Sequence, residues 1–505
     1  MIASTFERHI RIQQVFWFGL IAVFALGLGY FLAQAPILVV LGMGALLWLV
    51  LLPYHSKLAV YLAFATFNSA LILPYFPGRP YMWEFAGMLA WTGLVITISL
   101  RQYRKDFARL IEPHKWVFIG SVGYCLVLLV TMFYRGFGFR ILGSEVMGGR
   151  YYFQQLVCAI FPLLFVLVKF EERTLVKLFY MQCALTMTYL ISDFAFSVLP
   201  AQFFFLLQFF ELPGDAINFE WQSRTMGIRR FQSLYVVSNG FFFLLLVWHR
   251  AKDFFSLKGV YLLPMTLGVF GVGLLSGHRY LVMIVVVSLV FILYAQRFYD
   301  VKNTAIACGL LLMALVVAYG AAERLPLAAQ RALSILPGIS VHAQARDDGV
   351  GTLDTRRMLR THGMAMIPNY FWLGRGFGQA PSDYSMNWDP TALTLHINQG
   401  RFYNGFIGLM VNTGIFGTAF MLLFLLAGCH LAWRVMAILR QVGCEDHFTR
   451  MCSVIAGLYM ANVIAFLALH GDSEYAMKTF SLQTGVLLVC HYFLKQRAAA
   501  AAEAA

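Results

Sequence analysis

Charged residues are scarce in this chain of 505 residues: Asp, Glu, Lys and Arg together make up 12% of it, against 60% hydrophobic residues. A soluble domain uses about 25% charged residues to cover its surface. The mean hydropathy of +0.71 is also far above that of a soluble protein. This scarcity excludes a water-soluble globular fold and indicates a surface that is solvated mostly by lipid.

The cysteines and glycines form none of the common cofactor motifs. The eight cysteines include no Cys-x-x-Cys pair and no spacing typical of a zinc site. The glycines at 374, 376 and 378 in "LGRGFGQ" do not follow the Gly-x-Gly-x-x-Gly pattern of a dinucleotide site. We therefore expect no zinc site, no disulfide framework and no dinucleotide cofactor.

Long apolar runs recur along the whole sequence, at the length of about 17–25 residues that a helix needs to cross a bilayer. The first run lacks a small-x-small cleavage site and is expected to be an anchor. The sequence predicts an all-α, polytopic integral membrane protein with roughly 12–14 transmembrane helices and one large periplasmic loop. The expected spans lie near 13–33, 35–53, 57–76, 81–100, 115–133, 151–169, 174–199, 231–249, 259–277, 280–296, 303–321, 405–431, 452–470 and 479–495.

Four regions follow from this pattern. Residues 1–200 hold the N-terminal transmembrane helices, and residues 201–321 hold further helices that carry Arg230 and Arg279. Residues 322–402 form the large loop. Residues 403–505 hold the C-terminal transmembrane helices.

Lysine and arginine are distributed differently over the expected loops. With a cytoplasmic N-terminus, strict alternation of the spans places the strongly basic short connections inside and residues 322–402 outside. Lysines then fall on the inner side, except Lys478, while the loop 322–402 carries several arginines and no lysine. Topology needs only positive charge, whereas a planar guanidinium binds carboxylate or phosphate bidentately. The bias favours an anionic ligand on the outer side, with compositional drift as the alternative.

Two arginines stand at the ends of apolar spans. Arg230 directly precedes one span, and Arg279 follows a Ser-Gly-His break between two apolar runs. Ionisable groups at such depth are costly and indicate a functional site. Both are therefore candidates to bind an anionic ligand.

The large loop is expected to contain one short helix. "LDTRRMLRTHGMAMI" predicts a helix over 353–367 whose N-terminus is capped by Asp354 or Thr355. The spacing of four residues places Arg356 and Arg360 on the same face.

Four segments from about 230 to 417 carry a family resemblance. In "RRFQSLYVVSNGFFFLLL", Arg230 precedes by nine residues Asn239, which opens into a span. "LLSGHRYLVMIVVVSLVF" has Arg279 at a helix start, and "TRRMLRTHGMAMIPNYFWLGRGFGQ" has Arg356 and Arg357 before a glycine-rich turn. With "YNGFIGLMVNTGIFG" as the fourth, these segments resemble, in the same order, those of the O-antigen ligase and polymerase family.

The fourth segment departs from the family pattern of His-Asn, an apolar stretch and a Gly-x-x-Gly step. The match puts Tyr403 at the histidine position and Asn404 beside it, while His396 lies seven residues earlier, on the same face of a helix. Three interpretations stay open: His396 takes the role, Tyr403 fills it, or the chain is a divergent member with altered or absent activity. We favour His396 as the base, with Tyr403 and Asn404 orienting the substrate and Arg401 available to a phosphate or sugar.

The resemblance implies a GT-C-like glycosyltransferase in the bacterial inner membrane with a periplasmic active side. Its donor would be an undecaprenyl-diphosphate-linked glycan and its acceptor a saccharide or lipid-linked saccharide, with ligase and polymerase both open. Such transfer needs arginines for the diphosphate, here Arg230 and Arg279, and a general base. No acidic metal cage is visible, so we expect metal-independent transfer, no cofactor and no nucleic-acid partner.

Two other classes remain as alternatives. A lipid-linked oligosaccharide flippase would also need cationic groups, but such transporters usually show two related halves, and no repeat is apparent here. A non-catalytic assembly component of a polysaccharide export system stays open as well, because the His-Asn pair is missing.

Overall fold

The computed structural model describes residues 37–74, 76, 78–101, 103, 105, 107–138, 148–212, 227–378 and 393–504. The chain divides into two units, Met1–His55 and Ser56–Ala505. In the first unit, helix α2 (Ile37–Leu51) is followed by the short helix η1 (Leu52–Tyr54). The Trp48 indole N–H donates a hydrogen bond of 2.8 Å to Nδ1 of His55. The expected span near 13–33 lies outside the described residues.

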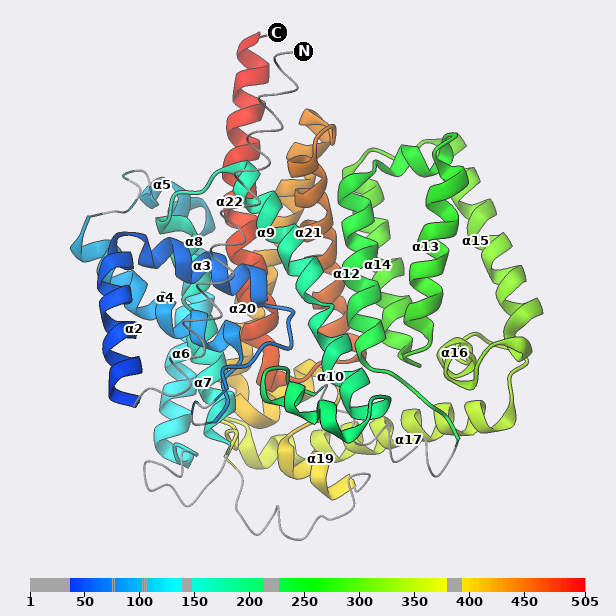
Figure 1. The fold of residues 1–505 in the computed structure, drawn as a ribbon, viewed down its shortest axis with the longest axis horizontal. Helices are drawn as coiled ribbons and strands as arrows, with labels where there is room; N and C mark the ends of the chain where they lie inside the picture. Colours follow the sequence, from blue (N-terminus) through cyan, green and yellow to red (C-terminus); the bar gives the residue numbers. More distant parts are fainter. Residues whose placement is uncertain are drawn as a thin grey trace. The chain divides into compact units, whose positions relative to one another are not determined.

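The second unit is built from helices (Figure 1). Its described residues contain isolated β-bridges, such as that between Leu71 and Phe210, and no β-sheet. Its α-helices are α3 (His55–Thr66), α4 (Met82–Ser99), α5 (Phe107–Ile111), α6 (Lys115–Arg135), α7 (Gly149–Cys158), α8 (Phe161–Leu167), α9 (Glu172–Leu185), α10 (Thr188–Ser197), α12 (Ser233–Trp248), α13 (Gly259–Leu274), α14 (Arg279–Ala295), α15 (Val301–Ala321), α16 (Leu327–Leu333), α17 (Ala343–Met366), α19 (Leu393–Gln399), α20 (Gly405–Val442), α21 (His447–Ile464) and α22 (Ala476–Ala504).

The helices have the length and composition of membrane spans, which confirms the predicted all-α, polytopic fold. Seven segments of the described chain are long and apolar enough to cross a bilayer: Gly42–Thr66, Met82–Ser99, Phe107–Arg135, Gly149–Leu167, Glu172–Ser197, Gly405–Val442 and His447–Leu469. Helices α12, α13 and α14 are shorter and also apolar. The spans expected near 303–321 and 479–495 fall within α15 and α22.

Small residues let the central helices approach closely. Helix α20 packs against α6 and α22, and α21 packs against α14. A Cβ atom on Gly120 of α6 would lie 2.6 Å from the backbone nitrogen of Phe424 in α20, and one on Gly457 of α21 would lie 2.7 Å from Ile292 in α14. In lipid the hydrophobic effect does not drive helices together, so close packing at such small residues is what stabilises the bundle.

Helix α20 is broken near its start by a segment from the large loop. Gly414 has a φ of +65° and is non-helical, and the backbone N–H of Ile415 donates to the carbonyl of Phe371 at 2.7 Å. The N–H of Arg375 donates to the carbonyl of Val411 at 2.8 Å, beside Gly374, whose φ is +74°. A side chain on Gly374 would overlap the backbone of Asn412. The glycine-rich turn of the sequence is therefore the piece that fits into the kink of α20.

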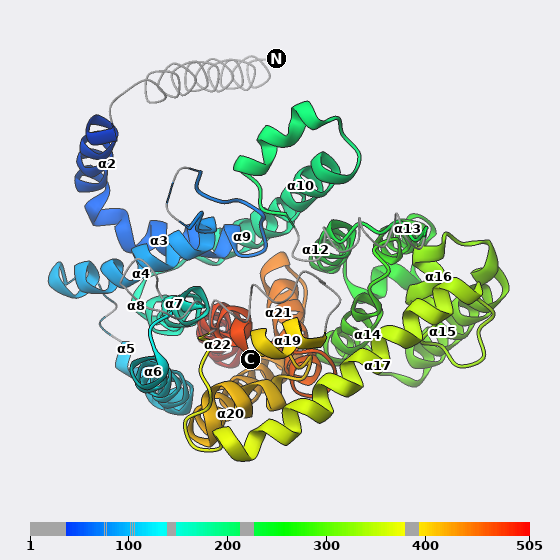
Figure 2. The same cartoon turned by 90° about the horizontal axis from the view of Figure 1, so that it is seen from below.

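The described part of the large loop is largely helical. It contains α16, α17 and α19, and α17 contacts α16, α19 and α20 (Figure 2). The predicted helix over 353–367 exists, but its predicted start is wrong. Helix α17 begins at Ala343, and its N-cap is His342, whose Nδ1 accepts a bond of 3.3 Å from the N–H of Gln344, rather than Asp354 or Thr355.

Candidate functional site

The turn between α13 and α14 brings arginines together. Gly277 in this turn has a φ of +69°, and a Cβ atom there would lie 2.7 Å from Cδ of Arg230. From the other side, Nη1 of Arg331 donates a hydrogen bond of 2.7 Å to the Gly277 carbonyl. Glycine alone combines this backbone conformation with so close an approach. Arg230, which precedes α12, is consequently buried against the turn, with 6% of its surface exposed.

Arg279, the first residue of α14, is the third arginine at this turn. Its Nε donates to the carbonyl of Arg331 at 3.4 Å, and its Nη2 donates to Oγ of Ser334 at 3.1 Å. The guanidinium also lies against Gly349 of α17, where any side chain would overlap it. Arg331 itself forms a buried ion pair with Asp348. The two hydrogen bonds of Arg279, from its Nε and its Nη2, therefore link α14 to α16. Its Nη1 takes part in neither of them.

Helix α17 adds two arginines to this region. The guanidinium of Arg356 lies 5.1 Å from the centre of the Tyr403 ring. Arg360, one turn later, donates to the carbonyls of Tyr403 at 3.0 Å and Leu469 at 2.6 Å. Their predicted common face is confirmed, whereas Arg357 lies on the exposed side of α17. We define the arginine cluster as Arg230, Arg279, Arg331, Arg356 and Arg360.

The arginine cluster leaves an excess of positive charge. Burial lowers the pKa of Arg356, and the charge of Arg331 acts in the same direction, while Tyr403 and Asp472 oppose it. Burial also lowers the pKa of His278 in the turn to about 3, with Arg230 and Arg331 as further causes. Among the described residues, Asp348 and Asp472 are the carboxylates that act on Arg279 and Arg356. Such a site favours an anion.

Four rings lie directly beside the arginine cluster. The hydroxyl of Tyr403 is 3.4 Å from Nδ1 of His396. The Tyr403 ring stacks on the ring of His470, with centroids 5.2 Å apart and an interplanar angle of 19°, and His470 meets Tyr280 edge-on at 5.9 Å. Tyr403 has a φ of +50°, a strained conformation for a residue with a side chain. We define the ring cluster as His396, Tyr403, His470 and Tyr280.

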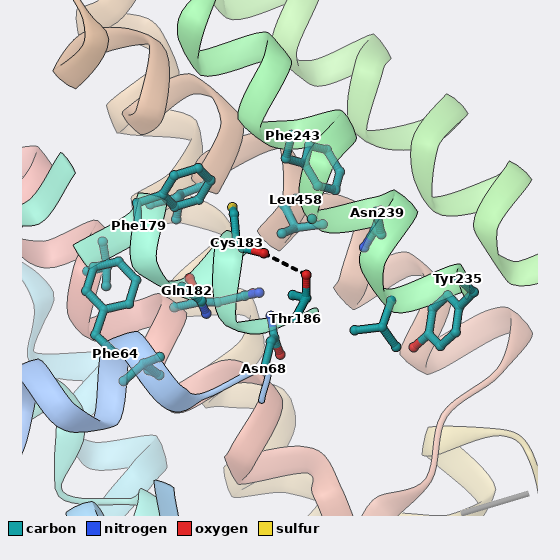
Figure 3. Close-up of a pocket in the computed structure, with 16 residues that line it drawn as sticks. Phe64, Asn68, Phe179, Gln182, Cys183, Thr186, Tyr235, Asn239, Phe243 and Leu458 are labelled. Carbon is teal, nitrogen blue, oxygen red and sulfur yellow. Dashed lines mark hydrogen bonds between the residues drawn. The ribbon is translucent and has the colours of Figure 1, made fainter. Parts of the chain in front are cut away.

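A cavity of about 120 Å³ lies among α3, α9, α12, α21 and α22 (Figure 3). Asn239 faces it from α12, and its Oδ1 has no hydrogen-bond partner among the described residues. A chain of hydrogen bonds links one wall residue of the cavity to the ring cluster: Tyr280 donates to Asn462 at 3.4 Å, and Asn462 donates to Gln483 of the cavity wall at 3.3 Å. Its hydrogen-bonding side chains are mostly uncharged amides and hydroxyls: Asn68, Gln182, Thr186, Tyr235, Asn239 and Gln483.

Two of the predicted substrate ligands hold the protein itself together. Nε of Arg401 donates to Oε1 of the buried Glu474 at 2.8 Å. Burial raises the pKa of Glu474 to about 7, with Asp472 adding to the rise and Arg401 opposing it. Asn404 is the N-cap of α20: its Oδ1 accepts from the N–H of Ile407 at 3.0 Å, and its Nδ2 donates to the Leu467 carbonyl at 3.1 Å. Both side chains are therefore bonded to other parts of the protein in this structure, and their role toward a substrate stays a prediction.

The structure brings together Arg230, Arg279, Arg356, His396 and Tyr403 from the residues predicted in the sequence. It adds Arg331 and His470, which sequence reasoning missed. Arg331 belongs to a loop already noted for its arginines, but no pattern distinguishes it from the others. His470 follows an apolar run in "FLALHGDSEY", where a single histidine gives no signal.

No group of three or more His, Cys, Asp and Glu residues that could hold a metal ion is present in the described part of the chain. Metal-independent transfer stays a prediction.

The comparison with known families covers the centre of this site. Residues 260–422 match the model of the family described as O-antigen ligase. The matched range includes Arg279, Arg331, Arg356, His396 and Tyr403, and it ends before His470. No curated protein is significantly similar to the chain. The match confirms the resemblance drawn from the sequence and supports a role in glycosyl transfer during O-antigen assembly.

Proposed function

We propose that the chain transfers a glycan from an undecaprenyl-diphosphate carrier to a saccharide acceptor, and the match of residues 260–422 to the O-antigen ligase family model supports this. The reaction takes place on the periplasmic side of the bacterial inner membrane and uses no metal. The observation that carries the proposal is the contact between the two clusters. Arg356 of the arginine cluster lies on Tyr403 of the ring cluster, so anion-binding groups and proton-accepting groups share one site.

The arginine cluster matches what the donor requires. Transfer breaks the bond between the anomeric carbon of the glycan and the diphosphate, which leaves with its negative charges. Guanidinium groups that are already in place stabilise this charge without reorganising during the reaction. Arg230 and Arg331 are fixed on either side of Gly277, so the cluster is preorganised by the fold. The diphosphate is a good leaving group once its charge is held, and this supports transfer without a metal.

The amide side chains of the cavity and the ring nitrogens of the ring cluster suit a saccharide. Amides such as those of Asn239 and Gln483 donate and accept hydrogen bonds at once, as sugar hydroxyls do. A ring nitrogen of the ring cluster accepts the proton of the attacking hydroxyl. His396, the base predicted from the sequence, contributes by its contact with Tyr403. The acceptor is either a lipid-anchored core saccharide, as in a ligase, or the end of a second carrier-linked glycan, as in a polymerase.

Reconstitution tests the activity. The full chain would be placed in vesicles that contain carrier-linked glycan isolated from the source strain, with and without a lipid-linked core saccharide. We expect glycan on the core saccharide from a ligase, or lengthened carrier-linked glycan from a polymerase. Movement of the donor between leaflets without any new glycosidic bond would identify a flippase, and the absence of both would identify an assembly component. Either of these last results contradicts the proposal.

Cysteine labelling tests the active side. His362 is exposed on α17 and Gln441 is exposed at the other end of α20. In a variant without native cysteines, an impermeant maleimide should label His362→Cys in intact spheroplasts and leave Gln441→Cys unlabelled until the cells are opened. The reverse pattern would place the site on the cytoplasmic side.

A further inference from the structure

The position that the resemblance assigns to a histidine holds Tyr403, yet a histidine ring is present at that place in the structure. His470 lies between the π-helical turn η8 (Ala465–Leu469) and the short helix η9 (Ser473–Tyr475). Its ring stacks on the ring of Tyr403, with centroids 5.2 Å apart and an interplanar angle of 19°. The structure therefore returns an imidazole to the site from a segment 67 residues further along the chain, counted from 403 to 470.

We propose that His470 is the general base of the transfer, and that Tyr403 and His396 are positioning residues that hold its ring. The inference rests on the proposed glycosyl transfer and names the group that accepts the proton.

Three other groups in the region are poorer bases. A tyrosine hydroxyl has an ordinary pKa near 10, so Tyr403 accepts a proton less readily than an imidazole at neutral pH. Burial lowers the pKa of His278, and the charges of Arg230 and Arg331 also oppose its protonation. His396 directs Nδ1 toward the Tyr403 hydroxyl at 3.4 Å, so it orients the tyrosine. His470 is half-buried and is therefore partly accessible to a substrate.

The surroundings of His470 fit this role. Tyr403 covers one face of the ring and Tyr280 meets it edge-on, so two aromatic contacts fix the plane of the imidazole. Arg360 donates to the carbonyls of both Tyr403 and Leu469, and thereby fixes the backbone on both sides of the stack. The strained φ of Tyr403 is stabilised by the same bond.

The acceptor hydroxyl gives its proton to His470 while its oxygen forms a bond to the anomeric carbon of the donor glycan. The bond between that carbon and the diphosphate oxygen breaks, and its electron pair leaves with the diphosphate. The arginine cluster stabilises the diphosphate, and the protonated imidazole returns its proton to water or to the released diphosphate.

Single-turnover transfer by the full chain in vesicles, with carrier-linked glycan from the source strain, tests the assignment. We expect His470→Ala to lower the rate by about 100-fold or more and to remove the acidic limb of the pH profile. Tyr403→Phe and His396→Ala should act more mildly, because each only holds the ring. His362→Ala, which removes an exposed histidine of α17, is the matched control and should leave the rate unchanged.

A double variant separates catalysis from folding. In His470→Ala/Tyr403→His, the imidazole moves to the other side of the stack, and the rate should recover by about tenfold over His470→Ala. Wild-type turnover in His470→Ala, or a loss confined to His396→Ala, would overturn the assignment while the proposed function stands. Failure of the wild-type chain to transfer glycan would instead overturn the proposed function, and the inference with it.

Discussion

The positive charges at the two ends of the central helices are balanced in different ways. At the end that holds the beginning of α21 and the last turns of α22, Arg497 binds Glu172 at 3.0 Å and Asp446 at 2.6 Å, and Arg250 pairs with Glu445. In the arginine cluster, Arg279 and Arg360 donate to carbonyl and hydroxyl oxygens instead of carboxylates. Neutral oxygens orient a guanidinium without cancelling its charge. Arg497 and Arg250 at the first end are therefore balanced by carboxylates, although Arg450 beside them donates to the carbonyls of Val247 and Glu445. The arginine cluster gathers more of such unbalanced charge at one place and so favours an anion.

Breaking the buried ion pair within the arginine cluster should destabilise the protein most. The side chains of Arg331 and Asp348 are 9% and 10% exposed. Arg331→Ala leaves the Asp348 carboxylate buried without its partner, which should lower the free energy of unfolding by about 3–5 kcal/mol. Thermal unfolding of the purified chain measures this. Arg331→Met/Asp348→Leu should be closer to wild type, and equal losses in both variants would show that packing, rather than charge, matters here.

Arg279→Lys tests whether the arginine cluster needs a guanidinium group or only a positive charge. Lysine keeps the charge but cannot make both contacts, with the Arg331 carbonyl and with Ser334. We expect the fold to persist and transfer to fall by about 10- to 100-fold. Arg497→Lys at the other end is the control, with transfer that changes by no more than about twofold. Near-normal transfer in Arg279→Lys would mean that only its positive charge is needed.

Inorganic diphosphate probes the unbalanced charge directly. At ten times its dissociation constant, a bound anion stabilises the folded chain by about 1.4 kcal/mol. We expect diphosphate to raise the Tm of the wild-type chain and of Arg497→Lys, and to have less effect on Arg279→Lys. Sodium chloride at equal ionic strength is the control. An equal response in all three proteins would show that the arginine cluster does not bind the anion.

Arg497→Ala should have the smallest effect. Its side chain is 31% exposed, so solvent screens the pairs with Glu172 and Asp446. We expect a loss of about 1 kcal/mol or less in unfolding free energy and unchanged transfer. A strong loss of transfer in this variant would contradict the division between the two ends.

The sequence was sufficient to predict the helical membrane fold and part of the site, because both depend on local patterns. Arg230 and Arg279 could be recognised since a charge beside an apolar run stands out. The true start of α17 could not be predicted, because Gly349 and Gly351 weaken the local preference for helix. Arg279 lies against Gly349, and Arg331 pairs with Asp348, so tertiary contacts stabilise these turns.

His470 and Arg331 were missed for a related reason. Each is a single residue without a motif, and each becomes significant only through a partner far away in the sequence. Gly277 connects Arg230 to Arg331 across 101 residues, counted from 230 to 331. The stack between Tyr403 and His470 depends on how α20 and α21 return to the same end of the bundle. Helical periodicity in the sequence does not show which helix ends meet in the folded bundle.

The kink in α20 links the shape of this helix to the loop that precedes it. The N–H of Ile415 and the carbonyl of Val411 are hydrogen-bonded to the segment 371–376, and not within the helix. These two groups stand four residues apart, so without the segment they would pair with each other as in a regular α-helix, and neither would be left unpaired in the bilayer. A straight form of α20 is therefore available before the loop folds, and binding of the segment selects the kinked form. A lesion in the segment is consequently expected to change the shape of the first turns of α20, and not the insertion of the helix into the membrane.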